Sequence, residues 1–202
     1  MTKHSIKPFS QDLTDWINGK QPKTLESLIN VFNEKSFAIL LFLLLALPAL
    51  PIPTGGLTHI TEIIAMFVAL QLIIGRKTIW LPKSWKKRDI SSIVKGKAAS
   101  KLISFIQWFE KYSRQRLGWI LNNALSLSLL GIVVLTYTVA AFSAPPFSGL
   151  DTLPALGVVI ISLGLILEDF IVTLVGIIAG AVGIGLVLAA GAALYSGFTH
   201  YF

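Results

Sequence analysis

The sequence predicts an all-α integral membrane protein made of two sequence-related halves with Pro/Gly-broken helices, and three observations predict it. Hydrophobic residues make up 54% of the 202 positions and charged residues only 13%, whereas a globular protein carries about 25% charged residues. The apolar residues gather in two blocks, 37–74 and 118–202, each longer than the roughly 20 residues that cross a bilayer as a helix. The third observation is an internal repeat.

The repeat appears when the second half is laid on the first without a gap. The matched positions include Pro53 with Pro146, Gly56 with Gly149, and Leu57 with Leu150. The same alignment places Gly75-Arg76 on Glu168-Asp169. This pattern favours a duplication, and the opposite charges of Arg76 and Asp169 suggest a salt bridge that would join the halves.

The chain is expected to contain five segments. They are a cytoplasmic amphipathic segment (1–35), a first broken-helix hairpin (36–75), a basic cytoplasmic linker with an amphipathic helix (76–117), a second repeat (118–169) and a C-terminal transmembrane helix (170–202). The polar first 35 residues contain no apolar core of a signal peptide, so we expect them to stay in the chain.

The positive charge, +7 overall, is concentrated in one place. Of 17 Lys and Arg residues, five lie in residues 1–35, 12 lie in 76–116 and none follows. Basic loops beside apolar spans stay in the cytoplasm, so we place residues 76–116 there, in a multi-pass membrane protein. Nucleic acid is not an expected partner.

A proline- and glycine-rich break interrupts the first apolar block. Prolines end the helix that begins near residue 37, because proline lacks a helical N–H donor, and a helix restarts at Leu57. The hairpin is either re-entrant or a pair of tight spans, and its broken backbone must be covered by protein or line a wet cavity. We assign structural or gating roles to the break residues and the equivalent positions: Pro53, Gly55, Gly56, Arg76, Pro146 and Gly149.

The linker and second half continue the pattern. Trp80 and Trp85 suit a membrane interface, and residues 94–117 form a basic amphipathic helix suited to an anionic leaflet. Residues 118–143 are long enough to cross, which would place the second break on the opposite side from the first and make the halves an inverted repeat.

The last helix carries a stripe of small residues at every fourth position. These are Ala181, Gly185, Ala189, Ala193 and Gly197. Small residues let two helices approach closely in lipid, so the stripe serves either packing within the chain or a homodimer.

The apolar segments contain few ionisable residues, and most are acidic. Glu62 follows His59 by one helical turn, and after Arg116 the only charged residues are Asp151, Glu168 and Asp169. Such groups mark pathways or pairs inside a membrane, and unpaired carboxylates would attract a cation. The alternatives are structural: Asp151 caps a helix, Glu168-Asp169 is an interfacial pair, and Glu62 pairs with His59.

Catalytic and cofactor motifs are missing. The sequence has no zinc-protease, phosphate-loop or nucleophile-elbow motif, no cysteine, and three widely separated histidines: His4, His59 and His200. We expect no enzyme activity, metal or cofactor.

The segment that follows the first break contains Ala69, Gln71, Leu72, Gly75, Arg76, Trp80, Leu81 and Pro82. In these residues it resembles the ExoD family of bacterial inner-membrane proteins associated with exopolysaccharide synthesis, and the second half is similar to that family around 153–155 and 163–165. The first helix differs, because family members tend to carry glycine where this chain has Thr61 or Glu62. The resemblance implies an inner-membrane protein with a link to exopolysaccharide.

Together these patterns predict a membrane transporter of a small cationic solute, with a basic amino acid such as arginine as the first candidate. The predicted substrate-binding residues are Glu62, Gln71, Asn123, Glu168 and Asp169. One alternative is a non-transporting accessory protein of exopolysaccharide synthesis or export. Another is a proton-coupled exporter or lipid-handling protein in which Glu62 and His59 relay protons.

Overall fold

The computed structural model describes residues 8–32, 35–50, 57–76, 78–87, 89, 91, 97–113, 117–121, 123–145 and 148–201. The helices of these residues are α1 (Phe9–Asn18), α2 (Leu25–Phe32), α3 (Ser36–Leu45), α4 (Leu57–Ile73), α5 (Lys83–Lys86), α7 (Lys97–Tyr112), α8 (Gly118–Leu121), α9 (Ala124–Ser143), α10 (Thr152–Leu167) and α11 (Phe170–Tyr201). In this part of the chain β-structure is limited to an isolated bridge between Thr24 and Asp89. The all-helical prediction is therefore confirmed.

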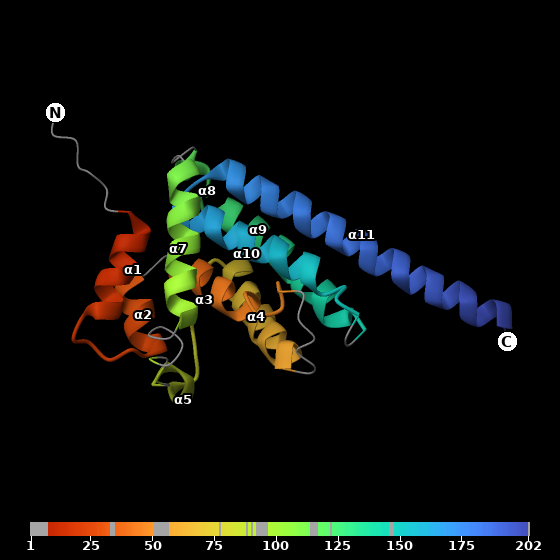
Figure 1. Ribbon diagram of the computed structural model, residues 1–202, viewed down its shortest axis with the longest axis horizontal. Coiled ribbons are helices and arrows are strands. Elements are labelled where there is room, and N and C mark those ends of the chain that lie inside the picture. Colours follow the sequence, from red (N-terminus) through yellow and green to blue (C-terminus); the bar gives the residue numbers. More distant parts are fainter. Residues whose placement is uncertain are drawn as a thin grey trace.

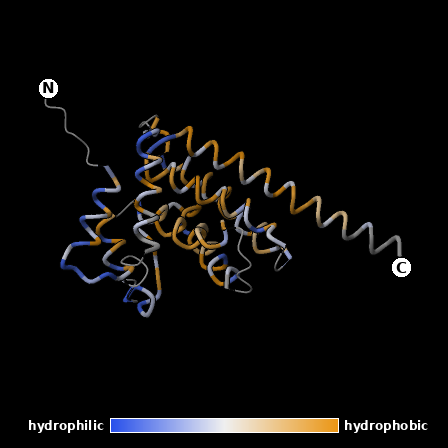
Figure 2. The backbone as a smooth tube through the Cα atoms, viewed as in Figure 1, coloured by the Kyte–Doolittle hydropathy of each residue, from blue (hydrophilic) through white to orange (hydrophobic). Residues whose placement is uncertain are grey.

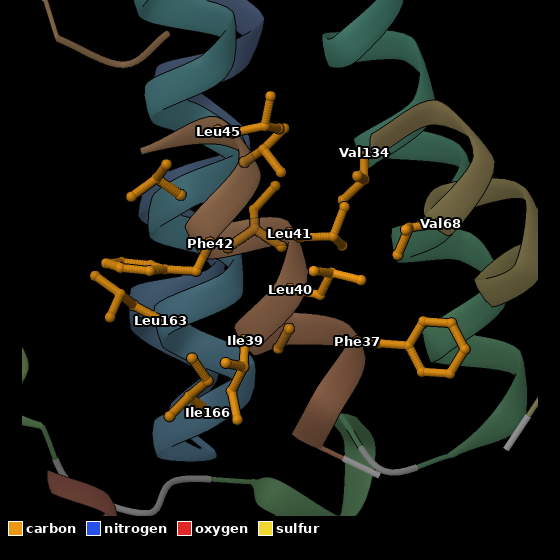
Figure 3. Close-up of a cluster of buried hydrophobic side chains, with 14 of the residues drawn as sticks. Phe37, Ile39, Leu40, Leu41, Phe42, Leu45, Val68, Val134, Leu163 and Ile166 are labelled. Atoms are coloured by element: carbon orange, nitrogen blue, oxygen red, sulfur yellow. The ribbon is translucent and has the colours of Figure 1, made fainter. Parts of the chain in front are cut away.

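The core is an apolar bundle of α3, α4, α9, α10 and the first half of α11 (Figure 1). Helix α10 is its centre, because it packs against α3, α9 and α11 and most of its side chains are buried. The short helix α3 is almost as deeply buried. Figure 3 shows its aliphatic side chains between Leu163 and Ile166 on one side and Val68 and Val134 on the other. A helix that is apolar on all faces belongs in such a position.

Contacts between hairpins fix the direction of each helix. Lys35, directly before α3, donates to the carbonyl of Ile166 at the end of α10 (3.1 Å). The ring of His59, early in α4, lies 5.1 Å from the ring of Phe142, late in α9. Helices α3 and α9 thus run from one end of the bundle, the linker end, to the other, the turn end, and α4 and α10 return.

This arrangement corrects the expected inversion of the halves. In an inverted repeat, equivalent helices run in opposite directions, whereas α3 and α9 run in the same direction here, as do α4 and α10. The reason is that each hairpin turns back once at the turn end, so α9 starts from the linker end, just as α3 does. Pro53, Gly55, Gly56 and Pro146 lie outside the described residues.

The two hairpins nevertheless end alike at the linker end. The N–H of Arg76 bonds to the carbonyl of Gln71 (3.1 Å), and the N–H of Asp169 bonds to the carbonyl of Gly164 (2.9 Å). Both bonds span five residues, as in the hydrogen-bonded ending of many helices. The alignment from sequence makes these two pairs equivalent.

Helices α10 and α11 pack with almost no side chain between them. A Cβ added to Gly157 would lie 2.5 Å from the Cα of Gly180, and one added to Gly176 would lie 2.6 Å from the backbone nitrogen of Ile161. Gly183 meets Pro154 in the same way. Small residues allow this backbone approach.

The stripe of small residues singled out from the sequence is not the one that packs within the chain. Ala181, Gly185, Ala189 and Ala193 are exposed, and a Cβ at Gly185 would meet nothing within 4 Å. Figure 1 shows α11, which also contains Gly197, running beyond the rest of the bundle. The stripe therefore does not pack against other helices of the same chain, and its use in a homodimer stays a prediction.

Two helical segments are long and apolar enough to cross a membrane: Ala124–Ser143 and Phe170–Ala193. The other core helices are shorter, with 10 residues in α3, 17 in α4 and 16 in α10. At about 1.5 Å per residue, α4 and α10 reach about 25 Å and α3 about 15 Å, compared with about 30 Å of hydrocarbon.

A more polar layer covers the linker end. It contains α1, α2, α5 and α7, with α7 lying across the axes of the bundle helices (Figures 1 and 2). Ser10 of α1 donates from both its N–H and its hydroxyl to the carboxylate of Glu110 in α7. Trp16 is buried and packs edge-on against Phe32. Amphipathic helices from two distant parts of the chain thus form one layer.

Candidate functional site

The five predicted substrate-binding residues do not lie together. Gln71, Asn123, Glu168 and Asp169 lie at the linker end, whereas Glu62 lies at the turn end, close enough to Asp151 for an electrostatic interaction. Along α4, nine residues or about 14 Å separate Glu62 from Gln71. The 16 residues of α10, about 24 Å, lie between Asp151 near Glu62 and Glu168, so a small solute at Glu62 would not reach Glu168 or Asp169.

Glu168 closes α10 and joins the two hairpins. Its backbone is left-handed (φ 56°), an uncommon conformation for a residue with a side chain. Its carboxylate lies 2.9 Å from the ammonium of Lys35, and both side chains are partly exposed. The sequence did not single out Lys35, because 133 positions separate the partners and no local pattern connects them.

Asp169 starts α11. Its Oδ1 accepts a hydrogen bond from the N–H of Ile171 and its Oδ2 accepts one from the hydroxyl of Ser113, both at 2.9 Å. The side chain is 3% exposed. Asp169 therefore caps a helix and fixes the end of the linker against it, and within the described residues it forms no ion pair with Arg76, which is exposed.

Asn123 and Gln71 also hold backbone groups. The Asn123 side chain accepts from the N–H of Leu125 (3.1 Å) and so caps α9. The Gln71 oxygen accepts from the N–H of Trp80 (2.6 Å), and its amide nitrogen donates to the carbonyl of Phe67 (3.3 Å). These contacts explain why the segment after α4 folds back to the helix.

Glu62 differs from these four residues. It lies on the buried stripe of α4 that faces α9, and it is completely buried (0% exposed). Its Oε2 lies 2.9 Å from His59 Nδ1, while its Oε1 has no hydrogen-bond partner. The His59 side chain is 28% exposed, so the pair reaches from the interior of the bundle to its surface.

Asp151, which lies at the turn end with Glu62 and His59, does not act as a helix cap. It directly precedes α10, but its side chain makes no capping hydrogen bond, and its backbone is helical. Its carboxylate adds negative charge near Glu62. The turn end therefore gathers two carboxylates and one imidazole from two helices.

A cleft of about 620 Å³ opens at the linker end between the polar layer and α10. Its polar lining consists of Ser10, Asp12, Lys35, Gln107, Glu110, Lys111 and Ser113. Sequence reasoning missed this cleft because it is formed by residues about a hundred positions apart. Among the described side chains, no group of three His, Cys, Asp or Glu residues has the spacing of a metal site.

The fold and these groups define a class: an all-helical protein with two helices able to span a membrane, a polar helical layer over one end and a buried carboxylate near the other. The particular family follows from comparison. Residues 9–189 match the family described as "Exopolysaccharide synthesis, ExoD", so the chain belongs to the ExoD family. The resemblance inferred from the residues around Gly75-Arg76 is thus confirmed.

Two relatives illustrate the family. An uncharacterized protein of Synechocystis sp. is 29% identical over 173 residues, which cover 84% of this chain and 81% of that protein. Protein ExoD of Rhizobium meliloti is 26% identical over 186 residues, covering 89% of this chain and 76% of that protein. No solved structure matches the chain.

Proposed function

We propose that the chain is a multi-pass protein of the bacterial cytoplasmic membrane that acts in exopolysaccharide synthesis or export as a non-transporting accessory component. The observation that carries this proposal is the family match, which covers both the apolar bundle and the polar layer. The two apolar spans support the membrane location, and the basic linker supports a cytoplasmic linker end.

An accessory role fits how the polar residues are used. Gln71, Asn123, Glu168 and Asp169 stabilise helix ends and the joint between hairpins. These contacts account for the position of each side chain without a bound solute. The layer of α1, α2, α5 and α7 offers a cytoplasmic surface on which an enzyme of polysaccharide assembly could dock.

The test is deletion of the gene in its host with measurement of secreted exopolysaccharide. We expect reduced or altered exopolysaccharide, restored by the intact gene. Restoration by a chain with Gln71→Ala and Asn123→Ala would support the accessory role, provided that the variant protein accumulates normally. Unchanged exopolysaccharide after deletion would contradict the proposal.

Transport of a small cationic solute is the second candidate, and buried Glu62 is the observation that favours it. The substrate-binding set predicted from sequence would then have to work as two separate groups, because even Gln71, on the same helix as Glu62, lies nine residues or about 14 Å from it. Purified protein in liposomes should take up labelled arginine or another cationic solute if this candidate is correct. Absence of uptake, with exopolysaccharide still dependent on the gene, would leave the accessory role.

A further inference from the structure

The buried carboxylate of Glu62 is incompletely bonded in this fold. Among the described residues, two buried side-chain oxygens lack a hydrogen-bond partner, Glu62 Oε1 and Ser162 Oγ. A hydroxyl without a partner is neutral, whereas a carboxylate can carry a full charge. Burying an uncompensated charge is far more costly than burying a neutral group. If Glu62 is ionised, its negative charge therefore requires a compensating positive charge close to it.

The surroundings supply little of it. Helix α4 packs against α3 and α9, and neither contains a Lys, Arg, His, Asp or Glu residue. The ionisable Tyr137 of α9 donates its hydroxyl to the carbonyl of Ile177. The turn residues 51–56 and 146–147 have no ionisable side chain. His59 is thus the one nearby group able to become positive, and Asp151 adds a second negative charge.

We propose that Glu62 is a proton-binding site at the turn end of the bundle, with His59 and Asp151 near it. The Oε1 atom of Glu62 supplies the unused acceptor, and Asp151 increases the attraction for positive charge. His59, partly exposed and 2.9 Å from Glu62 Oε2, lies on the route between the carboxylate and the surface. Binding at this site can be measured whether or not the chain acts in exopolysaccharide synthesis.

Its position in the repeat supports a specific function for this half of the molecule. The residue equivalent to Glu62 is Ala155 in α10, which is also completely buried. The same depth in the second hairpin is therefore filled by a methyl group. Packing alone does not require a carboxylate at this level of the bundle.

The experiment is thermal unfolding of the purified full-length chain in detergent. One series replaces choline chloride by lithium, sodium or potassium chloride at constant ionic strength, and another varies pH in choline chloride. A bound ligand stabilises the folded state in proportion to the logarithm of its excess over Kd. We expect the Tm of the native chain to rise by about 3 °C or more as the pH of the second series is lowered, and the Glu62→Gln chain to lack that rise.

Glu168→Gln is the matched control, because it neutralises a carboxylate that already has Lys35 as its partner at the other end of α10. This variant should keep the full response. A response in the pH series alone supports the proton site, whereas a response to one alkali ion that Glu62→Gln lacks would overturn it. If the native and Glu62→Gln chains respond equally in both series, the proposal is wrong.

A second measurement does not depend on the stability of a variant. Dicyclohexylcarbodiimide, an apolar reagent, modifies carboxyl groups in apolar surroundings, and peptide mass spectrometry locates the adduct. We expect labelling of Glu62 in the native chain to rise at least threefold over the pH range in which Tm rises, because the carbodiimide reacts with the protonated carboxyl group. Labelling of Glu62 that pH does not alter would overturn the proposal.

Discussion

Gly75 and Glu168, which the sequence alignment of the two halves places on each other, both have left-handed backbone, with φ of 73° and 56°. Each ends a core helix at the linker end, and the residue after each bonds to a carbonyl five positions earlier. Glycine adopts this conformation without steric cost, whereas a residue with a Cβ does not. The ion pair between Glu168 and Lys35 holds the second ending in a conformation that the first reaches with glycine.

Gly75→Ala should therefore destabilise the protein by about 1–2 kcal/mol, the cost of left-handed backbone in a residue with a side chain. The cost is conformational, because a Cβ at Gly75 would meet nothing within 4 Å. Thermal unfolding in detergent measures it. Gly191→Ala is the control, since this helical glycine is equally open. Equal Tm values for the two variants would contradict this account.

Lys35→Met should cost more stability than Glu168→Gln. The lysine both pairs with Glu168 and donates to the carbonyl of Ile166, and both contacts are lost in Lys35→Met. Partly exposed ion pairs contribute about 0.2–1 kcal/mol, and a typical hydrogen bond about 1 kcal/mol. We expect a loss of about 1–2 kcal/mol for Lys35→Met and less than about 1 kcal/mol for Glu168→Gln. The reverse order would show that the carbonyl contact is unimportant.

Gly157→Ala should weaken the packing of α10 on α11. The added methyl would lie 2.5 Å from the Cα of Gly180 and 3.0 Å from the carbonyl oxygen of Gly176, and backbone atoms cannot rotate away. Overpacking of this kind costs about 1–3 kcal/mol. Gly185→Ala is the matched control, because its site is open and alanine favours a helix by about 1 kcal/mol relative to glycine. If Gly157→Ala leaves the stability unchanged, the two helices are further apart in solution than in this structure.

Asp169→Ala should destabilise the start of α11, whereas Asp151→Ala should not destabilise the start of α10. Asp169 accepts from the N–H of Ile171, but Asp151 makes no capping bond. Loss of a helix cap costs about 1 kcal/mol, and loss of the bond from Ser113 adds to it. Far-ultraviolet circular dichroism during thermal unfolding compares the variants. A larger loss for Asp151→Ala would contradict the assignment.

The direction of the hairpins predicts which side of a membrane each turn faces. The chain contains no cysteine, so single cysteines can be placed without a background. Leu50→Cys and Ser148→Cys mark the two exposed turns, and Lys83→Cys marks the linker end. In sealed membrane vesicles a charged maleimide should label the first two from one side and the third from the other. Labelling of Leu50→Cys and Ser148→Cys from opposite sides would restore the inverted repeat.

The sequence alone determined the class of fold and the family. Apolar composition and length predict helices able to span a membrane, because only a helix satisfies its own backbone hydrogen bonds within one segment. The local motif from Ala69 to Pro82 was sufficient to identify ExoD relatives. The ends of helices, such as the one at Gly75, also depend on neighbouring residues, and the alignment of the halves predicted where they lie.

Tertiary structure decided which residues are near one another. Lys35 with Glu168, Ser113 with Asp169 and Ser10 with Glu110 are pairs that no local pattern predicts. The five predicted binding residues were divided between two ends of the bundle because each hairpin turns back at the turn end. Periodicity assigns a residue to a face of its own helix, but the direction in which that helix runs beside its neighbours depends on packing of the whole chain.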